Sequence, residues 1–400
     1  MIAPAGSLLG HIAVPGDKSI SHRAVLIGSV CEGEVRITGF GRSRDTEATV
    51  RAMRALGVDV LEEDIDVLRI RGAGLRGLRE PREPIDCGNA GTLLRLLAGL
   101  LAGQQGRFEL AGDESLNARP VDRVAEPLER MGGKVETREG FPPLVIEGSS
   151  LHGIEYELPV ASAQVKSCIL MAGLLASGRT SVVEPVPTRD HTEIMLEAAG
   201  APIARAPHRV TVEATDRLRL DEVVVPGDIS AAAPFVLAAT LLPGSELYVH
   251  GVGLNPRRTG FLDVRSAPLI AATVSAQEVP LLVDELPLLA LAAGFARGES
   301  VVQGAQELRV KETDRLEAVT TSLRALGVRV AATDDGFRVR GVPSRPKGGG
   351  MDSQGDHRLA MLAAVAGLVS REGVEVGEPQ AVAVSFPGFY ELLDSVAQRS

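Results

Sequence analysis

A single pattern recurs six times along this chain of 400 residues and limits the folds that are open to it. In every copy, a helix that is apolar nearly all round is followed by a glycine and then by a short strand. Helices of that kind are buried in folded proteins, and glycine commonly marks the end of a helix. We therefore expect repeated units, each built around one buried helix. The copies span residues 24–40, 93–110, 167–185, 233–252, 286–304 and 358–376.

A second helix, amphipathic rather than apolar, follows most copies and leads through a glycine into a strand or a hairpin, as in residues 46–64, 121–148 and 317–341. The whole unit is then β-α-β-α-β-β and about 65 to 70 residues long, a period that can be read off the sequence. Since 400 residues are too many for one ordinary core, six units predict an α/β (α+β) protein with two domains of three units each. The hexapeptides V-P-G-D-K-S (14–19) and V-P-G-D-I-S (225–230) mark the first unit of each half.

The fourth unit departs from the pattern. After residues 255–264 the chain runs directly into R-S-A-P-L, without the rest of the amphipathic helix, its glycine and most of the hairpin. By comparison with the other units, about 25 to 30 residues are missing around positions 264–276. We expect this loss to expose apolar surface and to lower stability by several kcal/mol, at about 25 cal/mol per Å² of apolar burial lost.

Composition excludes several classes of protein. The net charge of −10 argues against general nucleic-acid binding, although a basic cleft on an acidic protein can still attract a small anion. The three cysteines lie far apart and form no metal-binding or disulfide pattern, which fits a reducing compartment. Apolar runs such as 359–369 are about half of a membrane span, and the N-terminus does not read as a secretory signal. We therefore expect a cytoplasmic protein that binds neither nucleic acid nor membranes.

Charged and hydroxyl residues recur just ahead of the buried helices, where backbone N–H groups favour anions. Each segment alone is also explained by ordinary helix capping. Together they predict a cleft between the domains that binds two polyanionic small molecules. Lys166 is a further candidate for binding phosphate oxygens, with Ser162 and Gln164. The predicted cleft holds Lys18, Arg23, Arg119, Arg315 and Arg358 with the carboxylates Asp284 and Glu312.

These segments resemble the 5-enolpyruvylshikimate-3-phosphate synthase family. The motifs P-G-D-K-S-I-S-H-R, G-N-A-G-T, S-A-Q-V-K-S, R-D-H-T-E, D-E-x-P, R-V-K-E-T-D-R and G-D-H-R occur in the family's order along nearly the whole chain. The resemblance implies two inverse α/β domains, with six βαβαββ repeats in a pseudo-threefold arrangement and the fourth repeat shortened. One domain would comprise residues 1–14 and 226–400 and the other residues 15–225, with the active site in the cleft between them.

The resemblance also implies roles for individual residues. Asp284 would be the base for the 5-hydroxyl of shikimate-3-phosphate, Glu312 the acid for the methylene of phosphoenolpyruvate, and Lys18 the cation that compensates the departing phosphate. No metal and no organic cofactor is implied, and the protein is expected to be a monomer. The residues implied for shikimate-3-phosphate are Lys18, Ser19, Arg23, Ser162, Ala163, Gln164, Thr188, Arg189, Asp284 and Lys311. Those implied for phosphoenolpyruvate are Lys18, Asn89, Gly91, Arg119, Gln164, Arg315, His357 and Arg358.

The chain departs from the family at several positions. Val384 stands where many relatives have a lysine, and Thr188 stands where a serine is common. Gly91 is the form associated with sensitivity to glyphosate, so inhibition is expected. One alternative function is that of a UDP-N-acetylglucosamine enolpyruvyl transferase. The other is a homologue that binds shikimate-3-phosphate but is catalytically impaired because its fourth repeat is shortened. An RNA-end cyclase of related fold is disfavoured by the acidic charge balance.

Overall fold

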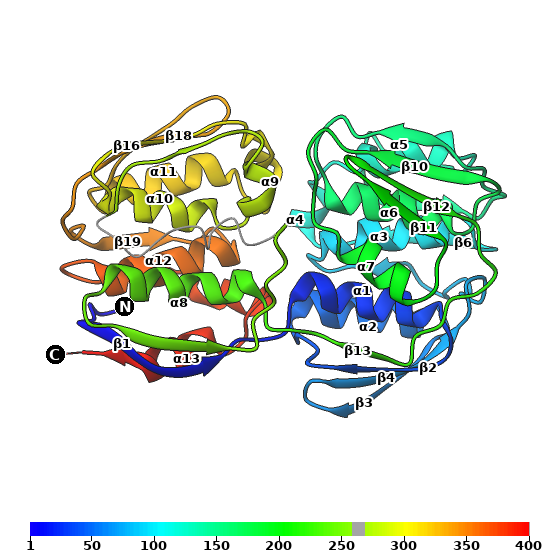
Figure 1. Cartoon of the computed structure of the whole chain (residues 1–400), viewed down its shortest axis with the longest axis horizontal. Coiled ribbons are helices and arrows are strands. Elements are labelled where there is room, and N and C mark those ends of the chain that lie inside the picture. The colour runs from blue at the N-terminus through cyan, green and yellow to red at the C-terminus, as the bar shows by residue number, and fades with distance from the viewer. Residues whose placement is uncertain (258–268, 400) are drawn as a thin grey trace. The chain divides into compact units, whose positions relative to one another are not determined.

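The computed structural model describes residues 1–257 and 269–399. The chain divides into two compact units. The continuous unit comprises Gly16–Val225, and the split unit comprises Met1–Pro15 together with Pro226–Ser400. Within the described residues each unit contains three β-sheets, and Figure 1 labels many of their strands and helices.

The three sheets of the continuous unit share one design. In each, a parallel pair of strands is followed by an antiparallel hairpin, in the order β13-β2-β4-β3, β5-β6-β8-β7 and β9-β10-β12-β11. The last strand of the unit, β13, therefore completes the first sheet. The bounds are β2 (Glu32–Thr38), β3 (Asp59–Asp64), β4 (Val67–Ala73), β5 (Ile85–Asp86), β6 (Arg107–Ala111), β7 (Lys134–Arg138), β8 (Phe141–Glu147), β9 (Glu155–Glu157), β10 (Arg179–Val183), β11 (Ile203–Ala206), β12 (Arg209–Glu213) and β13 (Glu222–Val224).

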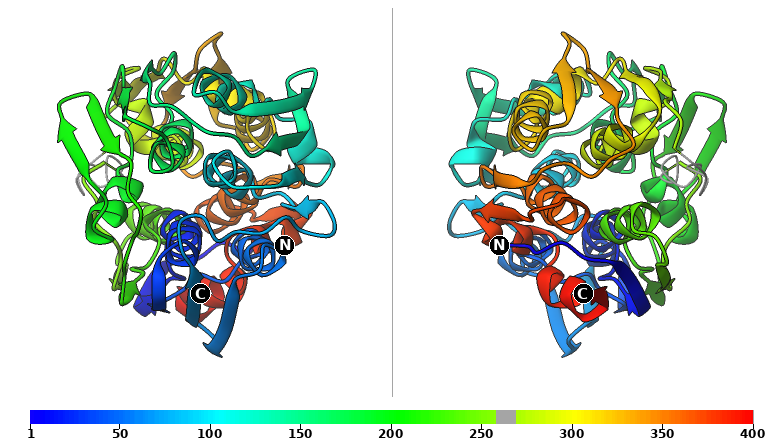
Figure 2. Two further views of the ribbon diagram at one scale, coloured as in Figure 1. Left: turned by 90° about the vertical axis from the view of Figure 1, so that its right-hand side faces the viewer. Right: turned by 90° about the vertical axis from the view of Figure 1, so that its left-hand side faces the viewer.

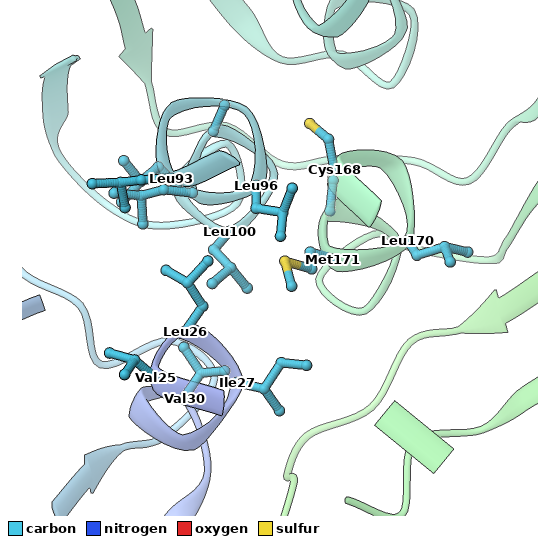
Figure 3. Packing of buried hydrophobic residues seen from close by; sticks show 14 of the residues in the cluster. Val25, Leu26, Ile27, Val30, Leu93, Leu96, Leu100, Cys168, Leu170 and Met171 are labelled. Atoms are coloured by element: carbon cyan, nitrogen blue, oxygen red, sulfur yellow. The ribbon is translucent and has the colours of Figure 1, made fainter. Parts of the chain in front are cut away.

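Three apolar helices form the centre of the continuous unit: α1 (Lys18–Ser29), α3 (Gly91–Leu101) and α6 (Ala163–Gly173). Figure 3 shows Leu26, Leu96, Leu100 and Met171 projecting into the space between these helices. The helices lie toward the middle and the strands around the outside (Figure 2, left). The remaining helices are α2 (Arg44–Ala55), α4 (Glu114–Asn117), α5 (Asp122–Arg130) and α7 (His191–Ala198).

The split unit has one sheet of the same design, in the order β15-β16-β18-β17, and two smaller ones, β19-β20 and β14-β1-β21. Its apolar helices α8, α10 and α12 form a second core. Its strands are β1 (Ser7–Ala13), β14 (Glu246–His250), β15 (Thr273–Val274), β16 (Gly298–Val302), β17 (Arg329–Ala332), β18 (Phe337–Gly341), β19 (Gly349–Asp352), β20 (Val374–Gly377) and β21 (Ala397–Gln398). Its helices are α8 (Ile229–Leu241), α9 (Val279–Leu282), α10 (Leu286–Phe295), α11 (Arg315–Ala325), α12 (His357–Val369) and α13 (Phe389–Val396), with 3₁₀-helices η2 (Gln306–Val310) and η3 (Pro379–Val384).

The fourth repeat corresponds to α8 and β14. Among the described residues β14 pairs only with β1, whereas its counterparts β2, β6, β10 and β16 each also pair with a hairpin strand. The inward side chains Leu247 and Val249 of β14 are only half-buried, but Val35 and Ile37 of β2 are fully buried. The predicted shortening around 264–276 falls in part on residues 258–268, which lie outside the described residues.

All three cysteines are buried free thiols. Burial raises the pKa of Cys31 and of Cys168 to about 12, and raises that of Cys87 further. At neutral pH these thiols are therefore protonated and unreactive. Within the described ranges, none of the helices combines the length and the apolar character that crossing a bilayer requires.

Candidate active site

The repeated V-P-G-D-x-S segments form the N-terminal caps of α1 and α8. The Asp17 carboxylate accepts a hydrogen bond from the backbone N–H of Ile20 (2.9 Å), and the Asp228 carboxylate accepts one from that of Ser230 (2.8 Å). The capping role that the sequence left open for Asp17 is thus confirmed, and the structure gives Asp228 the same role. Because Asp17 caps α1, Lys18 lies in the first turn of this helix. Its side chain is 19% exposed, and its ammonium lies 2.9 Å from Asp45 at the start of α2.

Arg23 joins three of the predicted motifs. This buried side chain donates from Nε to Thr192 Oγ1 (2.6 Å), from Nη1 to the carbonyl of Ser19 (2.9 Å) and from Nη2 to Ser167 Oγ (3.0 Å). The two hydroxyls also contact each other at 2.7 Å. Since these residues belong to α1, α6 and α7, one guanidinium links the starts of three helices that are distant in sequence.

A second arginine site lies at the start of α3. Arg119 Nη2 donates to Asn89 Oδ1 (2.5 Å) and to Ser115 Oγ (3.0 Å), and the Asn89 amide in turn donates to Asp113. Gly91 begins α3, and a Cβ atom there would lie 2.6 Å from Arg95 Nη1 and 3.6 Å from Arg119 Nη1. The structure therefore brings the predicted residues Asn89, Gly91 and Arg119 together.

Gln164, in the first turn of α6, faces α3. Its Oε1 accepts from Arg95 Nη1 (3.1 Å), and its Nε2 donates to Thr92 Oγ1 (2.9 Å). Ser162 caps α6, because its hydroxyl accepts from the Val165 N–H at 3.4 Å. Sequence reasoning missed Arg95, which lies beside the predicted ligand Gln164.

Thr188 and Lys166 meet at one buried carboxylate. Thr188 donates from its backbone N–H (3.0 Å) and from its hydroxyl to Glu184 Oε1. The ammonium of Lys166, whose side chain is 0% exposed, lies 3.0 Å from the same oxygen. Lys166 is therefore buried against carboxylates, and the structure does not support its predicted role as a direct phosphate ligand. Arg189, which follows Thr188, is half-buried.

The split unit assembles the predicted acid and base around Arg315. This guanidinium is 2.7 Å from Glu312 Oε2, 3.8 Å from Asp284 Oδ1 and, through Nε, 2.7 Å from Asp356 Oδ2. The side chains of Glu312 and Asp284 are 19% and 18% exposed, whereas that of Asp356 is fully buried. The two predicted catalytic carboxylates are thus accessible, and the third one anchors the arginine.

Electrostatics fix the charge of Arg315. Burial alone lowers the pKa of the guanidinium, but the negative charges of Asp356, Glu312 and Asp284 and the hydrogen bond with Asp356 raise that pKa well above its usual value. Asp356 also caps α12, because its Oδ1 accepts from the Arg358 N–H at 2.8 Å. Sequence reasoning missed Asp356 as a partner of Arg315, although Asp356 belongs to the G-D-H-R motif.

Arg358 and His357 open α12. Arg358 Nη1 donates to the Ser230 carbonyl (3.3 Å) and is 4.0 Å from Glu285, which itself accepts from the Ser230 hydroxyl. His357 is buried at the first position of the helix. Lys311 pairs with Glu307 at 2.9 Å.

Val384 is the last residue of η3 and is half-buried. Phe386 and Phe389, which follow it, pack with Phe235 of α8. Hydrophobic packing thus holds the segment that follows Val384 against α8.

Known proteins are similar to this chain over nearly its whole length. The sequence model of the family EPSP synthase (3-phosphoshikimate 1-carboxyvinyltransferase) matches residues 2–393. A 3-phosphoshikimate 1-carboxyvinyltransferase from a Geobacter species is 47% identical over 100% of this chain and 99% of its own length. The protein of the same name from Acidithiobacillus ferrooxidans is 46% identical, over 98% of this chain and 96% of its own.

Two solved structures share the fold. EPSP synthase from Acinetobacter baumannii has a TM-score of 0.86 and 37% identity, and covers 99% of this chain and 97% of its own. The enolpyruvyl transferase NikO from Streptomyces tendae, at 19% identity, has a TM-score of 0.80 over 99% and 96% of the two chains. The predicted fold class is therefore confirmed.

The alignment with the Geobacter protein is longer than this chain. It runs over 426 positions, so at least 26 of them (426 − 400) have no residue in this chain. That number agrees with the size of the segment predicted to be missing.

Proposed function

Because the chain belongs to the EPSP synthase (3-phosphoshikimate 1-carboxyvinyltransferase) family, we propose that it transfers the enolpyruvyl group of phosphoenolpyruvate to the 5-hydroxyl of shikimate-3-phosphate and releases phosphate. The observation that carries the proposal is the cluster in which Asp284 and Glu312 contact the buried Arg315. The reaction is an addition and elimination through a tetrahedral intermediate. It belongs to the shikimate pathway, which leads to chorismate and the aromatic amino acids.

The exposure of two carboxylates in this cluster supports acid and base roles. Asp284 and Glu312 both contact the guanidinium of Arg315, and their side chains are 18% and 19% exposed. Glu312 would supply a proton to the methylene carbon of phosphoenolpyruvate, and Asp284 would accept one from the attacking hydroxyl.

The arginines and Lys18 are proposed to hold phosphoenolpyruvate and to stabilise the departing phosphate. Asn89 and Ser115 orient Arg119 through neutral oxygens, and Arg358 is oriented by the Ser230 carbonyl. Lys18 offers a compact ammonium group beside Asp45. The proposal requires ligand groups from both units. Gln164, Gly91 and His357 complete the proposed set for this substrate.

Shikimate-3-phosphate is proposed to bind mainly through the continuous unit. Arg23, held by Ser167 and Thr192, would pair with the carboxylate of the substrate. The start of α6 would receive the phosphate, because the N-terminus of a helix favours anions. The full proposed set is Lys18, Ser19, Arg23, Ser162, Ala163, Gln164, Thr188, Arg189, Asp284 and Lys311.

Thr188 adds a condition to this proposal. Its hydroxyl and its N–H both donate to Glu184. A hydroxyl has one hydrogen, and a phosphate dianion needs donors. Direct donation from Thr188 to the phosphate would therefore require the hydroxyl to rotate away from Glu184.

We also propose that the reaction needs neither metal nor organic cofactor, since the acid, the base and the cations are side chains of the protein. We propose a cytoplasmic location, supported by three buried free thiols, which suit a reducing compartment. A monomer is proposed as well, and light scattering on the purified protein would test it.

The experiment is an assay of phosphate release with each substrate omitted in turn. We expect release only when shikimate-3-phosphate and phosphoenolpyruvate are both present. The variant Glu312→Gln, which keeps the shape of the side chain but cannot supply the proton, is expected to lose activity while remaining folded. Release without shikimate-3-phosphate, or none from folded wild-type protein, would contradict the proposal.

A further inference from the structure

Lys166 lies in a buried cluster of charges that the proposed mechanism does not use. Its ammonium is 3.0 Å from Glu184 Oε1 and 2.6 Å from Glu193 Oε1. The side chains of the three residues are 0%, 2% and 1% exposed. Lysine and glutamate are almost never fully buried unless they are paired. One cation here serves two carboxylates, so its removal would leave two buried negative charges side by side.

The two carboxylates belong to the segment that carries predicted substrate ligands. Glu184 directly follows β10 and accepts both hydrogen bonds of Thr188. Glu193 lies in the first turn of α7. Lys166 therefore holds both ends of the connection between β10 and α7 against α6, and this connection contains Thr188 and Arg189.

The same cluster adjoins the residues that orient Arg23. Ser167 follows Lys166 in α6, and Thr192 precedes Glu193 in α7. Their hydroxyls are 2.7 Å apart, and each accepts a hydrogen bond from the guanidinium. The ion pair between Lys166 and Glu193 thus spans the same two helices, one residue away from the hydroxyl pair.

We propose that Lys166 is a positioning residue for the binding of shikimate-3-phosphate. By neutralising Glu184 and Glu193 it keeps the connection between β10 and α7 docked on α6, and so keeps Thr188, Arg189 and Arg23 in place. Removing one member of a buried charge cluster strongly disfavours the arrangement around it. Without Lys166, either the connection between β10 and α7 moves or one of the two buried carboxylates takes up a proton. In both cases the affinity for shikimate-3-phosphate falls. This inference rests on the proposed function.

The test combines calorimetric binding of shikimate-3-phosphate with steady-state kinetics. Lys166→Met keeps the length of the side chain and removes its charge, Lys166→Arg keeps the charge, and Lys134→Met removes a lysine from an exposed pair with Glu147. We expect Lys166→Met to raise the Kd and the KM for shikimate-3-phosphate at least tenfold. The KM for phosphoenolpyruvate and the kcat at saturation should change less than threefold. Lys166→Arg should recover most of the affinity, and Lys134→Met should match the wild type.

A purely structural role gives a different result. Lys166→Met would then lower the melting temperature and the fraction of active enzyme but leave the Kd for shikimate-3-phosphate unchanged, and that outcome would overturn the inference. Failure of the inference is distinct from failure of the proposed function. Wild-type protein that neither binds shikimate-3-phosphate nor turns it over would overturn both, whereas active wild type with an unaffected Lys166→Met variant would overturn the inference alone.

A second pair of variants decides the question if Lys166→Met does not fold. Glu184→Gln retains an oxygen that can accept from Thr188, whereas Glu184→Leu does not, and both leave Lys166 paired with Glu193 alone. We expect the Kd for shikimate-3-phosphate to rise at least tenfold in Glu184→Leu and clearly less in Glu184→Gln. Equal Kd values for the two variants would contradict the inference.

Discussion

Arg23 in the continuous unit and Arg315 in the split unit are both buried and are both proposed to face an anionic substrate, but different groups orient them. Arg23 donates to the hydroxyls of Ser167 and Thr192 and to a backbone carbonyl, all of which are uncharged. Arg315 contacts the carboxylates of Asp356, Glu312 and Asp284.

The difference corresponds to two tasks in the proposed reaction. The hydroxyls of Ser167 and Thr192 orient Arg23, which is proposed to bind the carboxylate of shikimate-3-phosphate. Arg315 instead contacts two accessible carboxylates, Asp284 and Glu312, which are proposed to accept and to supply a proton.

The largest expected effect comes from Asp356. Replacing it by alanine leaves the buried guanidinium of Arg315 without its buried partner and removes the cap of α12. The free energy of unfolding should fall by about 3 to 5 kcal/mol, as for other broken buried pairs. Turnover should fall about a hundredfold or more, because a small misplacement of catalytic groups has that effect.

Urea unfolding and phosphate release measure the two effects. Asp394→Ala, which breaks an exposed pair with Arg399, is the control and should lie within about 0.5 kcal/mol of the wild type. If Asp356→Ala had the stability and the turnover of the wild type, carboxylates would not be what holds Arg315 in place. The contrast between Arg315 and Arg23 would then be wrong.

A smaller effect is expected at Thr192. The change Thr192→Val keeps the shape of the side chain but removes the acceptor of Arg23 Nε. A hydrogen bond to a charged group contributes about 1.5 kcal/mol, so the Kd for shikimate-3-phosphate should rise about tenfold. Calorimetry measures the Kd, and Thr211→Val, in a hairpin of the same unit, serves as the control. An unchanged Kd in Thr192→Val would argue against Arg23 as the anchor.

Gly91→Ala tests the arginines at the start of α3. The new Cβ would lie 2.6 Å from Arg95 Nη1 and would push this flexible group away from Gln164. We expect the KM for phosphoenolpyruvate to rise about fivefold, equivalent to about 1 kcal/mol, and inhibition by glyphosate to weaken. The KM for shikimate-3-phosphate should rise less, although Gln164 belongs to both proposed sets. Gly350→Ala, where a Cβ meets no atom within 4 Å, is the matched control. An equal rise for both substrates would contradict the assignment.

A pH-dependent effect is expected at His22, a buried imidazole that lies near the positive charges of Lys18 and Arg23. Burial first, and then the positive charges of Lys18 and Arg23, hold the pKa of the His22 imidazole well below its usual 6.5. Because the unfolded chain binds this proton more readily, the contribution to stability is complete above pH 6.5. It is lost as the pH falls below that value, at up to about 1.4 kcal/mol per pH unit.

Unfolding free energies between pH 7.5 and 5 therefore provide the test over roughly the window in which histidine titrates. The free energy of unfolding should change less steeply with pH in His22→Asn than in the wild type. The control is His152→Asn, which replaces an exposed histidine and should have the same slope as the wild type. Identical slopes in wild type and His22→Asn would show that His22 does not remain neutral on folding.

Local sequence patterns predicted the parts of the site that depend on neighbouring residues. Asp17 could be recognised as a possible cap because capping involves positions two or three residues apart, and Asp228 takes the same position in the second hexapeptide. The six buried helices could be recognised because apolar residues surround them on every side. Both signals act within a few residues of the chain.

Contacts between distant segments escaped the same reasoning. The bond from Arg23 to Thr192 joins residues 169 positions apart, and that from Arg315 to Asp356 joins residues 41 apart. Which hydroxyl or carboxylate faces a given arginine depends on the packing of whole helices. For the same reason Lys166 was interpreted as a phosphate ligand, although it pairs with Glu184 and Glu193 inside the core.

Identifying the product is the decisive test of carboxyvinyl transfer to shikimate-3-phosphate. Phosphorus and proton NMR of the complete reaction would follow both phosphates and the vinyl protons. We expect the phosphate of phosphoenolpyruvate to be released, the 3-phosphate to stay on the ring, and an enolpyruvyl ether to appear at the 5-hydroxyl. Loss of the 3-phosphate, or consumption of phosphoenolpyruvate without an ether product, would contradict carboxyvinyl transfer.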